Sequence, residues 1–402
     1  MSLLHISIKS ISKKPLFSLL ICSKYLFLLL FFAPAHATYL QSAGQQSKNG
    51  LFTNNLFYFG QDYGSESQFS PLNVFVNVGF VVAGRLGTDP QLNQIDYRGG
   101  WSNLHSIFVH QRAVFSENDG FRGSMQREFI PFAHDSGAWT PNYFLHLAGE
   151  GMLSRKLEEY FKHKGIKGDY LPKILSISTL VTAQLTKEAI EYELHWNYQL
   201  DQLADFYFNI AGIIAFSFDG FANLFSNDMV QYYFWPGQAV IDVQDSAIYN
   251  HGESYLLRTT LGSWTNWKFA LATGVPLNGI GVSIPLTAQN EYLTILPISS
   301  DVIVPGLKYD TQEELFDRDE QALVFEVMKH FTYGTSIFWD RRGSLLASAA
   351  ISYYPSFNLN LNIYPVKTKY MGIGGYFILS DKGASALGIT FSFTPIVPGY
   401  RF

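Results

Sequence analysis

The sequence predicts an α+β membrane protein, in which a three-helix block precedes a C-terminal antiparallel transmembrane β-barrel of about ten strands. Three observations support this fold class. Residues 1–37 resemble an export leader, residues 140–225 have helical patterning, and residues 250–402 alternate with period two. Strand counts of eight and twelve are alternatives, because the segment before residue 140 can supply further strands.

The first 37 residues predict a secretory signal peptide. Lys9 and Lys14 mark a basic start, an apolar run follows at residues 25–32, and Ala35-His36-Ala37 forms a small-residue cleavage site. A basic start, a short apolar core and such a site are typical of a cleaved leader. The core is too short for a good membrane-spanning helix. We therefore expect export, followed by residence in the cell outer membrane.

Composition excludes several kinds of partner and chemistry. Cys22, the only cysteine, lies in the predicted leader, so the mature chain would have no thiol or disulfide. The whole sequence has a formal net charge of −5, and removing the leader takes away lysines but no acid. Nucleic-acid binding needs a basic face, so we expect no nucleic-acid partner.

Residues 38–139 carry the weakest pattern in the chain. They are rich in Asn, Gln, Gly and aromatic residues. Residues 72–82 alternate apolar and polar side chains and predict one or two strands, whereas residues 103–116 are ambiguous. We expect a periplasmic or capping segment here, or extra strands for the barrel.

Residues 140–225 predict three helices. Thr140 and Pro141 form a helix start, with Thr as N-cap and Pro at the first helical position. The expected helices cover residues 140–160, 171–196 and 200–216. Their carboxylates would be costly in contact with lipid, so we expect the helices to pack on protein and not to span a membrane.

The C-terminal region alternates as strands with two different faces must. At residues 357–363, for example, Phe, Leu, Leu and Ile oppose three asparagines. A soluble sandwich also alternates, but its polar face should carry many charges, whereas here Gly, Ser, Thr, Asn and Ala dominate. The expected strands are 255–262, 267–277, 280–288, 291–298, 321–331, 334–340, 345–354, 357–365, 369–379 and 386–396.

The last residue, Phe402, follows the final alternating strand. A terminal Phe in this position resembles the assembly signal of outer-membrane barrels, although Pro395 and Pro398 interrupt the strand. The partners expected on this basis are outer-membrane lipid and the barrel-assembly machinery. The pattern does not predict an oligomeric state.

Six polar residues of the helical block can meet if the three helices pack together. They are His146, Glu150, Glu188, Glu191, Asp205 and Asn209. His146 and Glu150 are four residues apart, as are Asp205 and Asn209, so each pair would share one face of an α-helix. An imidazole with carboxylates and an amide suits general acid–base catalysis or a divalent metal. The interpretation that we favour is a buried polar network that orders the helices, with no cofactor.

Three short segments carry a resemblance to a known kind of protein. Residues 140–150, 187–193 and 201–212 resemble an uncharacterised domain-of-unknown-function family of bacterial outer-membrane proteins, in which a helical block of His, Glu and Asp precedes a C-terminal barrel. The resemblance implies His146, one of Glu188 and Glu191, Asp205 and Asn209 as the positions of interest, and it implies no known reaction.

These patterns predict location better than activity. We expect an outer-membrane barrel with a structural or envelope-maintenance role. One alternative is an outer-membrane enzyme that acts on lipid or peptidoglycan through His146 and the nearby carboxylates. The other is a narrow channel or transporter.

Overall fold

The computed structural model describes residues 55–401, apart from 84–91, 94, 118–119, 132–138, 194–198, 245, 263–264, 276, 288–289, 302–331, 355–356, 370, 382–384, 393 and 395. The predicted leader, the predicted strand at 321–331 and Phe402 lie outside these residues. The described residues belong to one compact unit, Ser47–Phe402.

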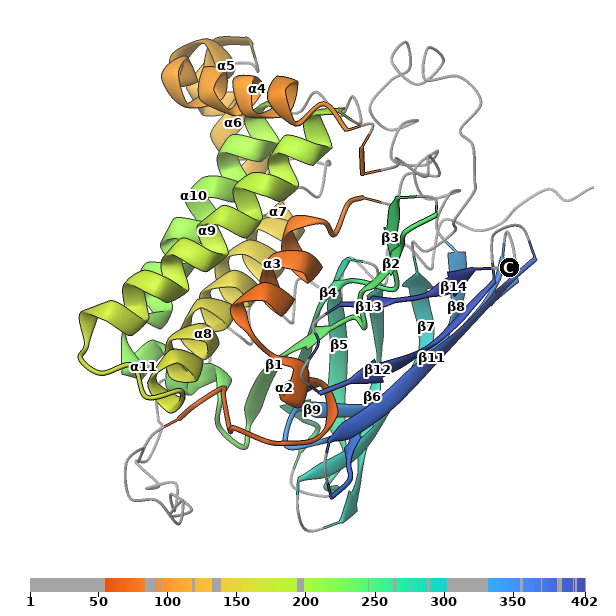
Figure 1. Ribbon diagram of the computed structural model, residues 1–402. Coiled ribbons are helices and arrows are strands. Elements are labelled where there is room, and N and C mark those ends of the chain that lie inside the picture. The colour runs from red at the N-terminus through yellow and green to blue at the C-terminus, as the bar shows by residue number, and fades with distance from the viewer. Residues whose placement is uncertain are drawn as a thin grey trace, which may run out of the picture. The chain divides into compact units, whose positions relative to one another are not determined.

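Helices fill the described part of the chain before residue 226 (Figure 1). They are α2 (Gly64–Gln68), α3 (Pro71–Gly79), α4 (Tyr97–Val109), α5 (Gln111–Glu117), α6 (Gly120–Glu128), α7 (Trp139–Pro141), the π-helix η1 (Asn142–Glu150), α8 (Gly151–His163), α9 (Tyr170–Glu193), α10 (Gln199–Phe216), α11 (Asp219–Ala222) and the 3-10 helix η2 (Asn223–Phe225).

The strand prediction for residues 72–82 is wrong, because α3 covers most of this range. The Ser70 side chain accepts a hydrogen bond from the Asn73 backbone N–H at 3.1 Å, and Pro71 occupies the first helical position. These are strong helix-start features. The ambiguous residues 103–116 are also helical, in α4 and α5. The described part of this region therefore contributes helices and no strands.

The three helices expected after residue 140 are present, with one local difference. The first is continuous from Trp139 to His163, but its middle, η1, is a π-helix. A π-helix closes i→i+5 hydrogen bonds, so its turns are wider than those of an α-helix, and residues four apart still lie close to one face.

Strands occupy the rest of the described chain. They are β1 (Val230–Pro236), β2 (Val240–Asp242), β3 (Ala247–Tyr249), β4 (Glu253–Thr260), β5 (Lys268–Val275), β6 (Leu277–Thr287), β7 (Glu291–Asp301), β8 (Thr332–Arg341), β9 (Ser344–Tyr354), β10 (Asn358–Lys367), β11 (Gly372–Ser380), β12 (Ala386–Phe391), β13 (Val397–Pro398) and β14 (Tyr400–Arg401). Nine of the ten predicted strands are present, and the strands that were not predicted are β1, β2, β3, β13 and β14.

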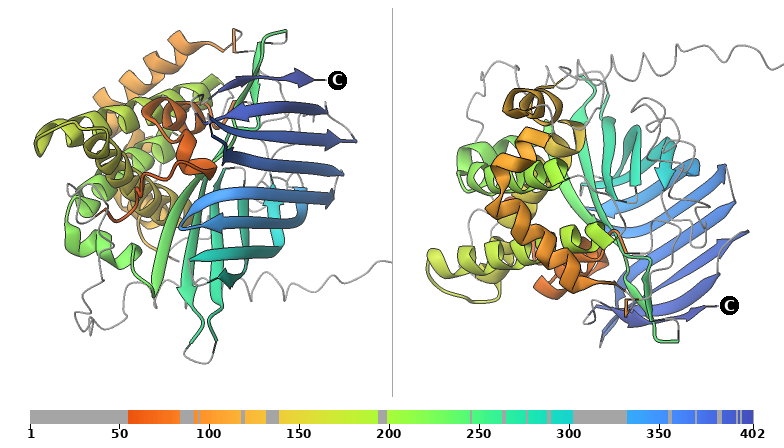
Figure 2. Two further views of the ribbon diagram at one scale, coloured as in Figure 1. Left: turned by 60° about the horizontal axis from the view of Figure 1, so that its bottom comes forward. Right: turned by 90° about the horizontal axis from the view of Figure 1, so that it is seen from above.

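The main sheet is antiparallel, with the strand order β1-β4-β5-β6-β7-β8-β9-β10-β11-β12-β14. The prediction of a closed barrel is wrong for the described residues, since β1 and β14 are two separate edges. A smaller sheet has the strand order β13-β2-β3. In it, β2, which follows β1 in the sequence, pairs with β13, which follows β12. The main sheet is strongly curved but open (Figure 2).

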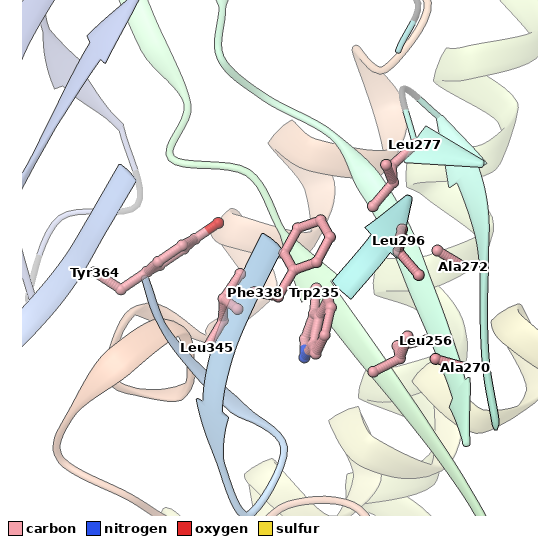
Figure 3. Packing of buried hydrophobic residues seen from close by; sticks show 9 residues of the cluster. All are labelled: Trp235, Leu256, Ala270, Ala272, Leu277, Leu296, Phe338, Leu345 and Tyr364. Carbon is pink, nitrogen blue, oxygen red and sulfur yellow. The ribbon is translucent and has the colours of Figure 1, made fainter. Parts of the chain in front are cut away.

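One face of the main sheet, here called the inner face, is packed with side chains. Trp235 of β1 packs against Phe338 of β8 with 4.9 Å between ring centroids, and Tyr364 of β10 donates a hydrogen bond to the Pro236 carbonyl at 2.8 Å. Contacts between strands this distant in the sheet order require the sheet to curl. Figure 3 shows Trp235 at the centre of this cluster, with Tyr364 and Leu345 on one side and residues of β4 and β5 on the other.

The inner face also carries a buried ion pair. The Arg258 guanidinium donates to both carboxylate oxygens of Asp340, and further to the hydroxyls of Ser283 and Thr294, each at 2.9 Å. Arg258 and Asp340 are both fully buried. The ring of Tyr292 lies 4.6 Å from the guanidinium carbon. Pairing of both charges with several hydrogen bonds makes their burial tolerable.

The opposite face, here called the outer face, is divided in two. At β1 and β4 the helical block covers it: the Tyr232 hydroxyl donates to the Phe144 carbonyl at 2.5 Å, and Gly149 lies against the Tyr255 ring. From β8 to β12 the outer face is apolar, and its large side chains are exposed among the described residues. Its exposed residues are Ile337, Trp339, Ile351, Tyr353, Leu361, Ile363, Ile373, Phe377, Leu379, Leu387 and Ile389.

No single described helix is both long and apolar enough to cross a bilayer. One sharply bent pair, Gln199–Phe216 with Asp219–Phe225, meets the criteria of length and composition.

Candidate functional site

A close helix crossing brings most of the predicted polar residues together. A Cβ atom on Gly212 of α10 would lie 2.2 Å from the Leu147 carbonyl of η1, so only glycine permits this approach of the two backbones. Asp205 and Asn209 precede Gly212 on α10 and face His146 across the crossing.

His146 is clamped between these two α10 residues. Its Nδ1 lies 3.0 Å from Asn209 Oδ1, and its Nε2 lies 2.9 Å from Asp205 Oδ2. The imidazole is only 2 % exposed. Both ring nitrogens therefore face an oxygen atom inside the helical block.

Lys187 is a second cation in the cluster. Its ammonium lies 3.6 Å from Asp205 Oδ2 and 3.4 Å from Glu188 Oε1. Burial alone would lower the pKa of Lys187, but the surrounding carboxylates, led by Glu188 and Glu191, raise it well above its usual value. Burial would raise the pKa of Asp205, yet His146 and Lys187 outweigh it and lower that pKa. Asp205 is thus the ionised centre of the network.

Glu188 and Glu191 lie on the other side of Lys187. Burial, followed by Glu191, raises the pKa of Glu188 well above its usual value. Burial also raises the pKa of Glu191, which is half-buried. Among the described residues, neither carboxyl oxygen of Glu188 has a hydrogen-bond partner. Glu188 lines a small pocket between α4, α9 and α10 of about 20 Å³, which is room for one water molecule.

Glu150 takes part in a different group from the one its spacing predicted. Gln184 of α9 donates a hydrogen bond to its Oε1, and the Glu253 side chain of β4 interacts with its carboxyl group. Burial and then Glu253 raise the pKa of Glu150 well above its usual value. Tyr255 donates to Glu253 at 3.0 Å. His146 and Glu150 have different neighbours, because His146 contacts α10 whereas Glu150 interacts with Gln184 of α9 and Glu253 of β4.

The structure therefore brings His146, Asp205 and Asn209 into direct contact, joins Glu188 to them through Lys187, and sets Glu191 nearby. Sequence reasoning missed Lys187, although it directly precedes Glu188. It also missed Glu253, which lies about a hundred residues from Glu150 and has no local pattern to mark it. Asp201, one helical turn before Asp205, was missed as well; burial and Asp205 raise its pKa well above its usual value.

The sequence suggested that the polar cluster of the helical block could bind a divalent metal, but the described residues provide no set of ligands for it. In the part of the chain that the structure describes, no three His, Cys, Asp or Glu side chains lie so that they could share a metal ion. A metal at this site stays a prediction without assigned ligands.

Comparison with family models, with curated proteins and with solved structures found no match to this chain. The resemblance to a family of outer-membrane proteins therefore stays a prediction.

Proposed function

We propose that this protein is an integral outer-membrane protein with a structural or envelope-maintenance role, whose outer sheet face lies in lipid. The observation that carries the proposal is the distribution of polar and apolar side chains, which is the reverse of that in soluble proteins: polar groups are buried and large apolar groups are exposed. The inner face buries the Arg258–Asp340 ion pair, whereas the outer face of β8 to β12 exposes large apolar side chains, with Ile363 at 58 % and Ile389 at 60 %.

This inversion follows strand by strand. On β10, Asn362 is buried and its neighbours Leu361 and Ile363 are exposed. On β12, Thr390 is buried and Ile389 is exposed. Among the described residues of β8 to β12, Lys367 at the end of β10 is the one exposed charged residue, and it pairs with Asp62. A contiguous apolar surface of this extent marks a lipid or partner interface, and an apolar face with so few charges opposite a polar one favours lipid.

A channel fits the described residues less well. The Trp235 cluster and the Arg258–Asp340 pair occupy the inner face. Side chains packed at this density leave little room for a solute path. A structural role needs no such path.

The enzyme alternative has no specific support from the polar cluster. His146 is almost fully buried, and both of its nitrogens are engaged by Asp205 and Asn209. A general base must reach a proton on its substrate. A clamp of this kind suits a network that holds η1, α9 and α10 together.

Export and assembly complete the proposal. The leader predicted at residues 1–37 would deliver the chain across the inner membrane. The barrel-assembly machinery is the partner we propose for insertion, since the sheet consists of antiparallel strands with an apolar outer face.

A single-cysteine labelling experiment tests the lipid contact. The chain from residue 38 onward has no cysteine, so Ile363→Cys on β10 and Ser102→Cys on exposed α4 give unique labels. Each protein is folded in lipid vesicles with a bimane label and exposed to lipids that carry a quencher on the acyl chain. We expect quenching at residue 363 and none at residue 102. Equal quenching of both labels by aqueous iodide, with none by the lipid, refutes the proposal.

Heat-modifiable gel migration provides a second, independent test of the membrane location. A folded sheet in detergent should migrate faster before heating than after it. Recovery in a soluble periplasmic fraction without any shift would instead favour a partner protein as the cover of the outer face.

A further inference from the structure

The turn between α8 and α9 concentrates basic residues on a protein that is acidic overall. The segment from Tyr160 to Ile174, here called the hairpin tip, has an excess of lysine over acid. Figure 2 shows this end of α9 projecting from the helical block on the side away from the sheet. The lysines are Lys162, Lys164, Lys167 and Lys173, and the acid is Asp169.

Most of these positive charges are not neutralised by the protein. Lys162 pairs with Glu158 at 2.5 Å. Within the described residues, no carboxylate lies at ion-pair distance from Lys164, Lys167 or Lys173. Lys164 and Lys167 are exposed, and Lys164 reaches over the Tyr160 ring at 5.4 Å from its centroid. The hairpin tip therefore presents free ammonium groups to the surroundings.

Large apolar side chains accompany these charges. Tyr170 is 81 % exposed, Leu171 52 % and Ile174 57 %. All three lie in the first turns of α9, next to Lys167 and Lys173 in the sequence. The other helical termini described above do not combine exposed aromatic and aliphatic groups with unpaired lysines in this way.

We propose that the hairpin tip docks on an anionic phospholipid surface, with Tyr170, Leu171 and Ile174 entering the headgroup region and the lysines contacting the phosphates. Lysine stems lie along apolar surface while their ammonium groups stay in the polar layer, and aromatic side chains favour the same layer. A nucleic acid would need a wider basic face and has no use for the aliphatic pair. The proposal adds a second membrane contact and does not depend on the lipid contact of the sheet.

The test places a fluorescent nitrobenzoxadiazole label on a Tyr170→Cys variant of the full mature chain. Phosphatidylcholine bilayers are compared with bilayers in which part of that lipid is replaced by phosphatidylglycerol. The label should report a less polar environment only with phosphatidylglycerol, and added salt should reverse the change. Each lysine near an anionic surface raises the membrane partition coefficient about fivefold. The double variant Lys164→Glu with Lys167→Glu should therefore lower that coefficient by more than about tenfold.

A matched charge change controls for the total charge of the protein. Arg98→Glu with Arg112→Glu alters exposed residues of α4 and α5 by the same amount. This pair should leave the response at residue 170 unchanged. An equal loss in both double variants overturns the docking proposal, because it would reflect overall charge alone.

A second label separates this proposal from the membrane proposal. If the label at Ile363 lies in lipid while the label at residue 170 stays in water in both bilayers, the docking proposal fails and the membrane location stands. If residue 170 responds to added anionic vesicles while residue 363 does not, the membrane-embedded sheet fails and the docking stands. An equal response of residue 170 to both bilayers shows an apolar anchor and overturns the anionic-lipid assignment.

Discussion

Replacing His146 by alanine should destabilise the helical block strongly. The substitution removes two contacts, at 3.0 Å to Asn209 and 2.9 Å to Asp205, from a site that is almost fully buried. A buried polar group that loses its partner costs about 1–3 kcal/mol, and more when that group is charged. Asp205 and Asn209 would both lose a partner, but Lys187 remains 3.6 Å from Asp205, so we expect a loss of about 2–4 kcal/mol.

Denaturant unfolding followed by far-ultraviolet circular dichroism measures this loss. His105→Ala, on the exposed side of α4, is the matched control and should change stability by less than about 0.5 kcal/mol. A double-mutant cycle with Asp205→Asn isolates the pair, and the coupling should be about 1–3 kcal/mol.

Two results would refute the reasoning. His146→Ala could match the His105→Ala control, in which case the clamp does not stabilise the block. Alternatively, the effects of His146→Ala and Asp205→Asn could add with no coupling. Either outcome would leave His146 available for a chemical role, and the enzyme alternative would then be the better hypothesis.

Three further substitutions address other parts of the structure. Burial and Glu253 raise the pKa of Glu150, so the folded protein keeps a proton on Glu150 that the unfolded chain releases above about pH 4.3. The wild type therefore loses stability as the pH rises from that value, and Glu150→Gln should become more stable relative to it. Equal pH dependence of the unfolding free energy in both proteins would contradict this. Gly212→Ala should cost about 1–3 kcal/mol in denaturant unfolding, whereas Gly220→Ala, where a Cβ meets nothing within 4 Å, should not destabilise. Ile389→Arg should lower the stability of the lipid-inserted sheet by about 2–4 kcal/mol, and an unchanged value would place this residue outside the hydrocarbon.

The strands of the sheet were predictable because each has two chemically distinct faces. Leu361 and Ile363 alternate with Asn362 in the sequence, and in the structure the first two are exposed and the third is buried. This period-two pattern is local, so a single sequence contains it. The open edges of the sheet are not local, because they depend on how β1 and β14 are placed after the whole sheet has curled.

The errors have equally definite causes. Residues 72–82 alternate like a strand, but the Ser70 cap and Pro71 start a helix, and α3 then packs on α9. Glu150 was grouped with His146 on helical spacing, but its contacts are with Gln184 of α9 and Glu253 of β4. The helix start at Ser70 and Pro71 is local and can be found in the sequence. The contacts of Glu150 depend on tertiary packing, of which a single sequence carries no direct record.

The helical cover on β1 and β4 has a consequence for how the protein reaches its native state. These strands are complete only when residues far earlier in the chain are already in place: Phe144 must meet Tyr232, and Asn77 must accept the Gly252 N–H. Ser65 in turn bonds to Leu345, 280 residues away in sequence. Contacts at such separations make folding slow and leave strand edges exposed meanwhile. The helices are synthesised before the strands. The helix face that will pack on β1 and β4 therefore stays exposed until the sheet has formed, and during that interval the chain needs protection from aggregation.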